Sequence, residues 1–177
     1  MPSPQTAQCT LIFPPTCGPR RPFGQSFSCS TGGVELDNPG ATYTATSTSM
    51  VVGRLEKQEL YGGLIPASSE ATALASLDMM LGDTPLGTLY QWMYFSAPAA
   101  VTGECATTTA YQGESGEPIV RRVVHDMNLA QGWNLIEVNI QEVQQPADRD
   151  HSMATLTRYR TIDAYPADTV WVFVPEE

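Results

Sequence analysis

Basic residues are scarce in this chain of 177 residues. It has 9 Lys and Arg against 19 Asp and Glu, and Lys57 is the single lysine, so its formal net charge is −10 at pH 7. Nucleic-acid binding depends on cations that replace counterions at phosphates, and basic segments also attract proteins to anionic lipid surfaces. The charge therefore argues against nucleic acid and against an anionic membrane face as partners, and it favours solubility.

Long apolar runs are missing as well. No run reaches the roughly 18 residues of a transmembrane helix. The first residues, MPSPQTAQC, have neither the basic end nor the apolar core of a signal peptide. We therefore expect no transmembrane segment, and the chain is either cytosolic or a mature form that received a new Met1. The cysteines help to decide between these two.

Recognisable catalytic motifs are absent too. Ser115 lies in G-E-S-G, which lacks the G-x-S-x-G spacing of a hydrolase nucleophile. Glu104, Glu114 and Glu117 could act as glycosidase carboxylates only if a cleft brought two of them together. No glycine pair is followed by the lysine of a phosphate-binding loop. The sequence therefore favours a non-enzymatic protein with no cofactor.

Four cysteines are present, Cys9, Cys17, Cys29 and Cys105, and none forms a C-x-x-C pair. A tetrahedral zinc site is therefore disfavoured, and an even count in a Pro- and Gly-rich chain suggests disulfides in an oxidising compartment. Among three possible pairings we favour Cys9–Cys17 with Cys29–Cys105. Four reduced, buried thiols are the alternative. The disulfides predict an extracytoplasmic location, in the periplasm, in the outer envelope or as a secreted protein.

The second half of the chain alternates apolar and polar residues in short runs, with turn formers about every ten residues. These runs predict strands at 87–96, 100–108, 118–129, 133–143, 152–162 and 169–175. The spacing is typical of an antiparallel β-sandwich. We predict an all-β fold with a sandwich domain at 41–177 and an irregular, Pro- and Gly-rich, disulfide-tethered segment at 1–40.

The first half gives weaker signals. Residues 41–56 and 58–68 are rich in strand-forming types, and residues 8–13 and 24–29 could add short strands. Residues 68–83 predict one short helix, because leucines recur there at helical spacing, a serine can cap the start and a glycine can end it.

The segment LAQGWNLIEVNI, residues 129–140, sets a glycine, a tryptophan and an asparagine between two apolar runs. Gly132 can take the positive φ that a hairpin turn needs. Trp133 can cover one end of the core, and Asn134 can hydrogen-bond the nearby backbone and lock the turn. These roles are structural and require no chemistry.

The strand that follows this turn has two distinct faces. Its even-numbered positions are apolar, namely Ile136, Val138 and Ile140, and its odd-numbered positions are Leu135, Glu137, Asn139 and Gln141. We expect the first set to face a core and the second set to face water.

Three stretches between residues 86 and 175 have a recognisable order: LYQWMYFSAPAAVTGEC, VVHDMNLAQGWNLIEV and LTRYRT…VWVFVP. They resemble a group of uncharacterised bacterial envelope β-sandwich lipoproteins and secreted proteins. In that group an aromatic strand precedes a V-T-G-x-C element, a G-W-N hairpin follows, and a Trp-bearing strand ends the domain. The resemblance implies an envelope location and supplies no catalytic residues. No apolar lipobox precedes Cys9.

Each histidine is followed two positions later by a methionine. His125 precedes Met127, His151 precedes Met153, and residues two apart on a strand point to the same side. Imidazole and thioether suit Cu(I), so two converging pairs would form a copper site. The alternative is that Met127 packs in the core and the histidines lie at strand ends. Copper is thus the alternative cofactor, and periplasmic copper binding the alternative function.

Tyr90, Trp92 and Tyr94 alternate along one predicted strand and would share one of its faces. An exposed aromatic face of this kind binds sugars or proteins, whereas a buried one forms part of a core. Together these observations predict a non-enzymatic extracytoplasmic β-sandwich. We expect it to act as a binding or assembly module of the bacterial cell envelope, with an envelope protein or a glycan as its partner.

Overall fold

The computed structural model describes residues 9–12, 21–22, 29, 31–46, 49–55, 58–77, 84–109, 118–145 and 152–175. The elements, in chain order, are β1 (Cys9–Ile12), β2 (Arg21–Pro22), β3 (Thr31–Asp37), β4 (Thr42–Thr46), β5 (Ser49–Leu55), β6 (Gln58–Ala67), α1 (Glu70–Leu77), β7 (Gly87–Phe95), β8 (Ala99–Thr109), β9 (Ile119–Leu129), β10 (Gly132–Gln144), β11 (Met153–Ile162) and β12 (Val170–Pro175). The predicted all-β fold with one short helix is confirmed. The six strands expected after residue 86 all form, because their apolar residues alternate with the period of a strand.

Helix α1 lies inside the range predicted for it. The Ser69 hydroxyl accepts a hydrogen bond from the backbone N–H of Thr72 at 3.1 Å, which is the geometry of an N-cap. The Thr72 hydroxyl in turn donates to the backbone oxygen of Leu86 at 3.0 Å. The cap therefore both starts the helix and ties it to the chain that leads into β7.

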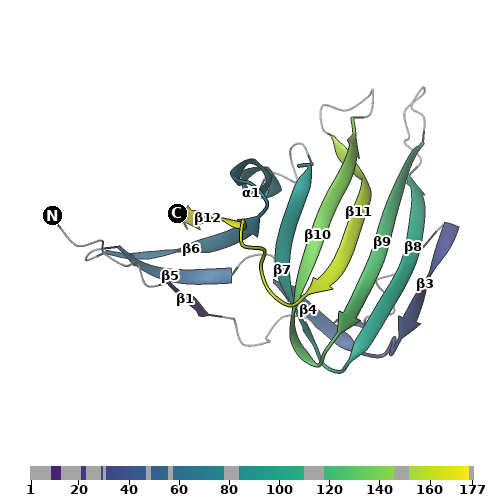
Figure 1. Ribbon diagram of the computed structural model, residues 1–177, viewed down its shortest axis with the longest axis horizontal. Helices are drawn as coiled ribbons and strands as arrows, with labels where there is room; N and C mark the ends of the chain where they lie inside the picture. The colour runs from purple at the N-terminus through teal and green to yellow at the C-terminus, as the bar shows by residue number, and fades with distance from the viewer. Residues whose placement is uncertain are drawn as a thin grey trace.

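The described strands are hydrogen-bonded into one sheet rather than two (Figure 1). Its main path runs β1-β5-β6-β7-β10-β11-β9-β8-β3, β12 adds to β6, and β2 adds to β4, which pairs with β7. The pairing is antiparallel, as predicted, except between β9 and β11, which run parallel. A single curved sheet thus takes the place of the two separate sheets expected of a sandwich.

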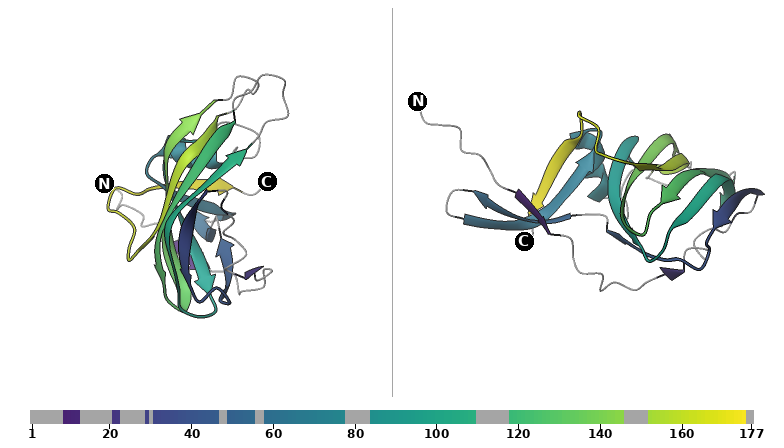
Figure 2. Two further views of the ribbon diagram at one scale, coloured as in Figure 1. Left: turned by 90° about the vertical axis from the view of Figure 1, so that its right-hand side faces the viewer. Right: turned by 60° about the horizontal axis from the view of Figure 1, so that its bottom comes forward.

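Curvature brings β3, at one end of the main path, and β4, which pairs with β7, to one apolar core (Figure 2). β3 and β4 pair with different strands, yet only residues 38–41 separate them. Asn38 adopts a positive φ of 56°, and its backbone oxygen accepts from Ala41 N–H at 3.0 Å, which makes the connection tight. The buried core residues are Ala41, Met93, Phe95, Ala99, Val101, Met127, Leu129 and Ile136.

The turn between β9 and β10 is short, but the two strands are not neighbours. β11 lies between them, antiparallel to β10 and parallel to β9. Asn134 holds the turn, since its side chain accepts from the N–H of Ala130 at 2.8 Å and donates to the carbonyls of Ala130 and Gly132. Gly132 has a φ of 103°, so the predicted positive φ and the predicted role of Asn134 are confirmed.

β3 forms where the sequence indicated turns, within the segment 1–40. It pairs with β8 along its whole length, and two glycines with positive φ, Gly32 and Gly103, allow the close approach. A Cβ on Gly103 would collide with the backbone of Gly33 and lie 3.1 Å from the Cα of Val34. The glycines that look like turn formers in sequence therefore serve strand packing.

β10 differs from its predicted pattern on one face. Ile136 and Ile140 are buried as expected, but Leu135 and Glu137, which were expected to face water, are also buried. The prediction of a wet face is wrong there because other parts of the chain cover it, as described in the next section.

The remaining elements form a wing beside the curved part (Figures 1 and 2). β5 and β7 pair with one edge of β6, and β12 pairs with the other edge. α1 lies against β6, β7 and β12, and a small second core unites Ile65, Ala67 and Ala73 with Leu89, Val172 and Val174. Within the described residues, no helix has the length and apolarity needed to span a bilayer.

Candidate binding surface

Six aromatic side chains gather on the outer face of β7 and β10, opposite the main core. We call them the aromatic cluster: Tyr90, Trp92, Tyr94, Trp133, Tyr165 and Trp171. Edge-to-face contacts join Tyr165 to Tyr90, Trp92 and Trp171, and a separate contact joins Tyr94 to Trp133. Ring centroids are 5.5 Å apart for Tyr94 and Trp133 and 4.7 Å apart for Tyr165 and Trp171. This arrangement is favourable for aromatic rings and gives the cluster a fixed shape.

Strand geometry explains four of the six members of the cluster. Tyr90, Trp92 and Tyr94 are two residues apart on β7 and share its outer face, as their spacing predicts. Trp133 of β10 pairs in register with Tyr94, so the two rings meet across the strands.

Tyr165 and Trp171 come from the chain after β11, and Trp171 lies on β12. Residues 163–169, here named the strap, lead from β11 to β12 and carry Tyr165 (Figure 1). The backbone N–H and hydroxyl of Thr169 both donate to the carbonyl of Pro166, at 3.1 and 2.8 Å, which closes a turn in the strap. The Tyr165 ring lies 5.7 Å from that of Tyr90 and 6.2 Å from that of Trp92.

The strap explains why Leu135 and Glu137, on the outer face of β10, are buried. Tyr90 and Trp92 lie under Tyr165, and their partners in register on β10 are Glu137 and Leu135. Glu137 is buried, but its carboxylate accepts a hydrogen bond from the Arg160 guanidinium at 2.7 Å. The hydrogen bond and charge of Glu137 raise the pKa of Arg160 above its usual value. The buried carboxylate is therefore paired, as a buried charge must be.

Two tyrosines in the cluster are held in their neutral form. Burial raises the pKa of Tyr90, and the negative charge of Glu137 raises it further. Burial also raises the pKa of Tyr165, although the nearby Trp92 acts in the opposite direction. Neither hydroxyl is thus a candidate nucleophile at neutral pH.

The three predicted binding-face residues lie together, but they are not openly exposed. Tyr90 is buried, while Trp92 and Tyr94 are half-buried. The cluster reaches the surface mainly at Trp171, of which 40% is exposed. Whether these side chains bind a ligand stays a prediction.

Further apolar side chains are exposed beside the cluster on β12, which the sequence identified only as a strand. Phe173 and Val170 are each 36% exposed and lie on the same short strand as Trp171. β12 pairs with β6 alone among the described residues, so one backbone edge of the strand has no strand beside it. We call Val170, Trp171, Phe173 and this free backbone the β12 edge.

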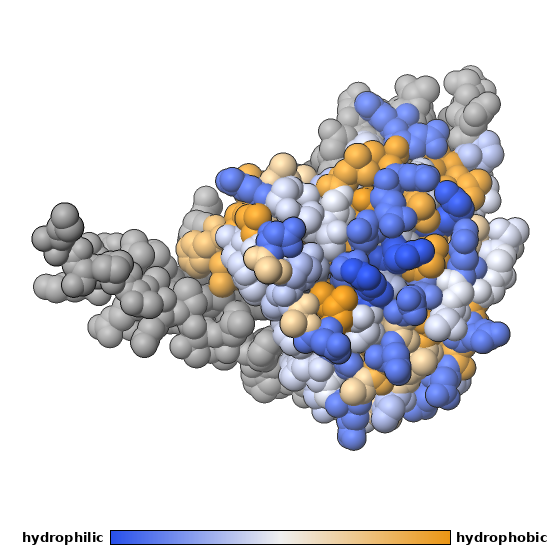
Figure 3. Space-filling view, viewed as in Figure 1, coloured by the Kyte–Doolittle hydropathy of each residue, from blue (hydrophilic) through white to orange (hydrophobic). Residues whose placement is uncertain are grey.

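The neighbouring outer surface is charged (Figure 3). Hydrophilic side chains gather over the middle of the sheet in this view. Arg122 of β9 lies 3.4 Å from Glu142 and 4.0 Å from Glu104, and all three are exposed. Glu104, considered above as a glycosidase carboxylate, is therefore part of a surface ion-pair group. Ser115, Glu114 and Glu117 lie outside the described residues.

The predicted copper ligands are placed only in part. His125 and Met127 are buried on β9, and His125 stacks on Tyr159 with ring centroids 5.5 Å apart. Desolvation lowers the pKa of His125 from 6.5 to about 4. His125 is thus a neutral residue of the main core, and Met127 packs there as the alternative interpretation expected.

Met153 is far from that pair. His125 is in register with Tyr159, six residues beyond Met153 on β11, and six residues of strand span about 20 Å. His151 lies outside the described residues. Within the described ranges, no three His, Cys, Asp or Glu side chains gather as metal ligands would. Copper binding stays a prediction, and the three placed residues do not converge.

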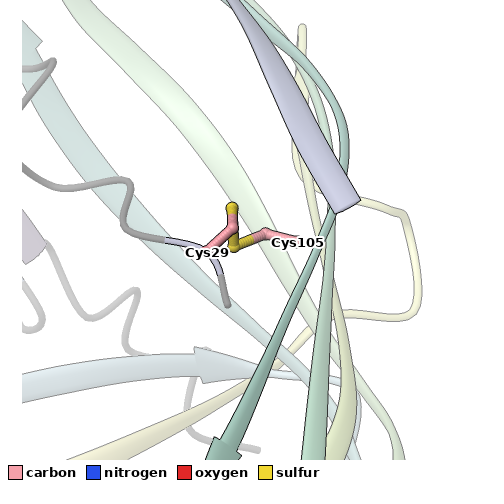
Figure 4. The surroundings of a disulfide bond; sticks show 2 residues. All are labelled: Cys29 and Cys105. Atoms are coloured by element: carbon pink, nitrogen blue, oxygen red, sulfur yellow. A yellow bond between two sulfur atoms is a disulfide. The ribbon is translucent and has the colours of Figure 1, made fainter. Parts of the chain in front are cut away.

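The predicted Cys29–Cys105 disulfide is present (Figure 4). Its sulfur atoms are 2.02 Å apart, and it joins residues separated by 76 positions. It ties Cys29, just before β3, to β8. Cys9 lies in β1 and Cys17 lies outside the described residues, so the Cys9–Cys17 pairing stays a prediction.

A scan with protein-family models matched no family, and searches of curated proteins and of solved structures found no match to this chain.

Proposed function

We propose that this protein is a non-enzymatic binding or assembly module of the bacterial cell envelope, and that it binds another protein through the β12 edge. The observation that carries the proposal is the exposure of Val170, Trp171 and Phe173 on one strand, next to the aromatic cluster. Contiguous exposed apolar side chains mark interaction sites, and tryptophan is enriched among residues that dominate binding energy.

The disulfide supports a location outside the cytoplasm. Disulfides such as Cys29–Cys105 form and persist in oxidising compartments and are rare in the cytosol. The resemblance around the G-W-N turn adds the bacterial envelope to this argument, and Asn134 does lock that turn. An envelope location therefore rests on the disulfide first and on the resemblance second.

A protein partner fits the surface better than a glycan. Sugar binding uses flat aromatic faces that are open to solvent, but five of the six rings in the aromatic cluster are buried or half-buried. The β12 edge instead combines alternating side chains with free backbone groups, and both features suit another polypeptide.

Site-specific photo-cross-linking in the source cells tests the proposal. Trp171 is replaced by p-benzoyl-phenylalanine, and the control places the same cross-linker at Val120, an exposed apolar residue of β9 that is 47% exposed. We expect position 171, but not position 120, to give a covalent product with another envelope protein, identified by mass spectrometry. Equal products from both positions, or none from position 171, would contradict the proposal. Free thiols at Cys29 and Cys105 in the native protein would contradict the location.

A further inference from the structure

In the part of the chain that the structure describes, β12 is an edge strand with one side of its backbone unpaired. Its residues 170–175 pair antiparallel with residues 62–67 of β6, and no other described strand pairs with it. In an antiparallel pair, alternate residues direct their N–H and C=O groups away from the neighbour. β12 therefore presents a row of donors and acceptors along one side, which is a template for an added strand.

Between Val170 and Val174 this edge carries none of the charges or positive-φ residues by which proteins often protect an edge, and Pro175 lies only at the end of the strand. β12 contains no charged residue, whereas β3, which also pairs with only one strand, carries exposed Glu35 and Asp37 and a positive-φ Gly32. Inserted charges and backbone irregularities discourage pairing with other chains. Among the described strands, the β3 edge is thus protected, whereas the β12 edge is apolar and has no strand beside it.

The negative charge around β12 indicates which kind of segment can pair with this edge. Asp168 precedes β12 and is exposed, Glu176 and Glu177 follow it in sequence, and the whole chain carries a net charge of −10. A second copy would bring the same negative charge, including its own Asp168, to this edge. Like charges across a strand pair destabilise it, so a basic segment fits this edge and a second copy does not.

We propose that β12 accepts, as an added strand, an extended segment of another protein with alternating apolar residues and Lys or Arg at its ends. The inference rests on the proposed function and names the partner's chemistry. Main-chain hydrogen bonds to β12 supply the pairing, and apolar side chains of the segment contact Trp171 and Phe173. A basic end of the segment approaches the exposed Asp168, and its positive charge complements the net negative charge of the chain.

A labelled peptide, Lys-Lys-Val-Thr-Val-Thr-Val-Lys-Lys, provides the probe for fluorescence anisotropy with the full chain. One comparison peptide replaces every lysine by glutamate. A second is N-methylated at the central Val and the adjacent Thr, which blocks both edges and keeps the side chains. We expect each change to weaken binding at least tenfold, because the first reverses the charge and the second removes the main-chain donors.

Matched protein variants locate the site. Val170→Lys and Val120→Lys add the same charge to two exposed strand valines, and circular dichroism checks that both variants fold. We expect Val170→Lys to weaken the basic peptide at least tenfold and Val120→Lys to change its affinity less than twofold.

Four results would overturn the inference: no binding of the basic peptide, equal binding of the N-methylated peptide, equal effects of the two variants, or self-association in sedimentation that Val170→Lys abolishes. A different result would assign the edge to a glycan instead. In that case the protein would bind peptidoglycan sacculi, Val170→Lys would abolish this binding, and the basic peptide would not compete with it. A cross-link from position 171 to a protein, with the peptide arms negative, would leave the proposed function standing and remove this inference alone.

Discussion

His125 shows what the core does to a single titratable residue. It stacks on Tyr159, is only 9% exposed, and has a pKa lowered by desolvation from 6.5 to about 4. In the unfolded chain the same imidazole takes up a proton near its ordinary pKa. Between these two values the unfolded state binds more protons, so the free energy of unfolding decreases as the pH falls from 6.5 to 4.

We predict that His125 removes about 3 kcal/mol of stability between pH 7 and pH 4, since one pKa unit corresponds to about 1.4 kcal/mol. His125→Phe keeps an aromatic ring beside Tyr159 and cannot titrate. Urea unfolding of both proteins at several pH values checks this, and the variant should lose about 3 kcal/mol less than the natural chain. Parallel stability profiles of the two would contradict the burial of a neutral imidazole.

Asn134 is the residue on which the β9–β10 turn depends. Its amide makes three hydrogen bonds to the backbone of Ala130 and Gly132. We predict that Asn134→Ala lowers the free energy of unfolding by about 2 kcal/mol, because each net hydrogen bond contributes about 0.5 to 1.5 kcal/mol. Asn139→Ala, which removes a side-chain hydrogen bond to Thr88, is the matched control. Equal losses in urea denaturation would show that the turn does not need Asn134.

At the scale of elements, the pairing of β3 with β8 depends on glycine. Gly103 has a φ of 124°, and a Cβ there would meet the backbone of β3. Gly132 has a φ of 103°, and a Cβ there would have nothing within 4 Å. The two positions thus separate backbone strain from steric collision.

We predict that Gly132→Ala costs about 1 kcal/mol through strain alone. Gly103→Ala should cost about 3 kcal/mol, because overpacking against β3 adds about 2 kcal/mol more. Thermal or urea unfolding of the two variants measures the difference. If Gly103→Ala were as mild as Gly132→Ala, the close approach of β3 and β8 would be wrong.

Much of this element structure was predictable from the sequence. Strands β7 to β12 and helix α1 follow from apolar periodicity and turn residues, which are local signals. The order β10-β11-β9 was not predictable, because a short turn between two strands normally makes them neighbours. The burial of Leu135 and Glu137 was missed for a similar reason, since the strap that covers them comes from a distant part of the chain.

The candidate site was predictable only in part. The shared face of Tyr90, Trp92 and Tyr94 follows from a period of two, but Tyr165 joins them through tertiary folding. The sequence also identified β12 as an apolar strand, which is the same pattern that a central strand has. Whether a strand lies at the edge of a sheet depends on which other strands pair with it, and the local sequence does not determine this.

For the whole molecule, the Cys29–Cys105 disulfide connects the segment before β3 to the curved sheet. A cross-link across 76 positions is worth about 4.5 kcal/mol in the chain-entropy model and 2 to 5 kcal/mol in practice. We predict a loss in this range for Cys29→Ala/Cys105→Ala in a Cys9→Ser/Cys17→Ser background, measured by urea unfolding. Reductant should lower the stability of the Cys9→Ser/Cys17→Ser protein, which keeps Cys29 and Cys105, to that of the variant that also lacks these two cysteines. If reductant leaves its stability unchanged, the disulfide does not stabilise the fold.

The insertion of β11 between β9 and β10 constrains the order in which the molecule can assemble. During synthesis β9 and β10 emerge first, joined by a turn short enough to zip them together. β11 is synthesised after β9 and β10. If these two strands pair with each other first, that pairing must break before β11 can insert between them. The hydrogen bonds of Asn134 are local to the turn and do not require β9 and β10 to pair. The turn can therefore form while the space between these two strands stays available to β11.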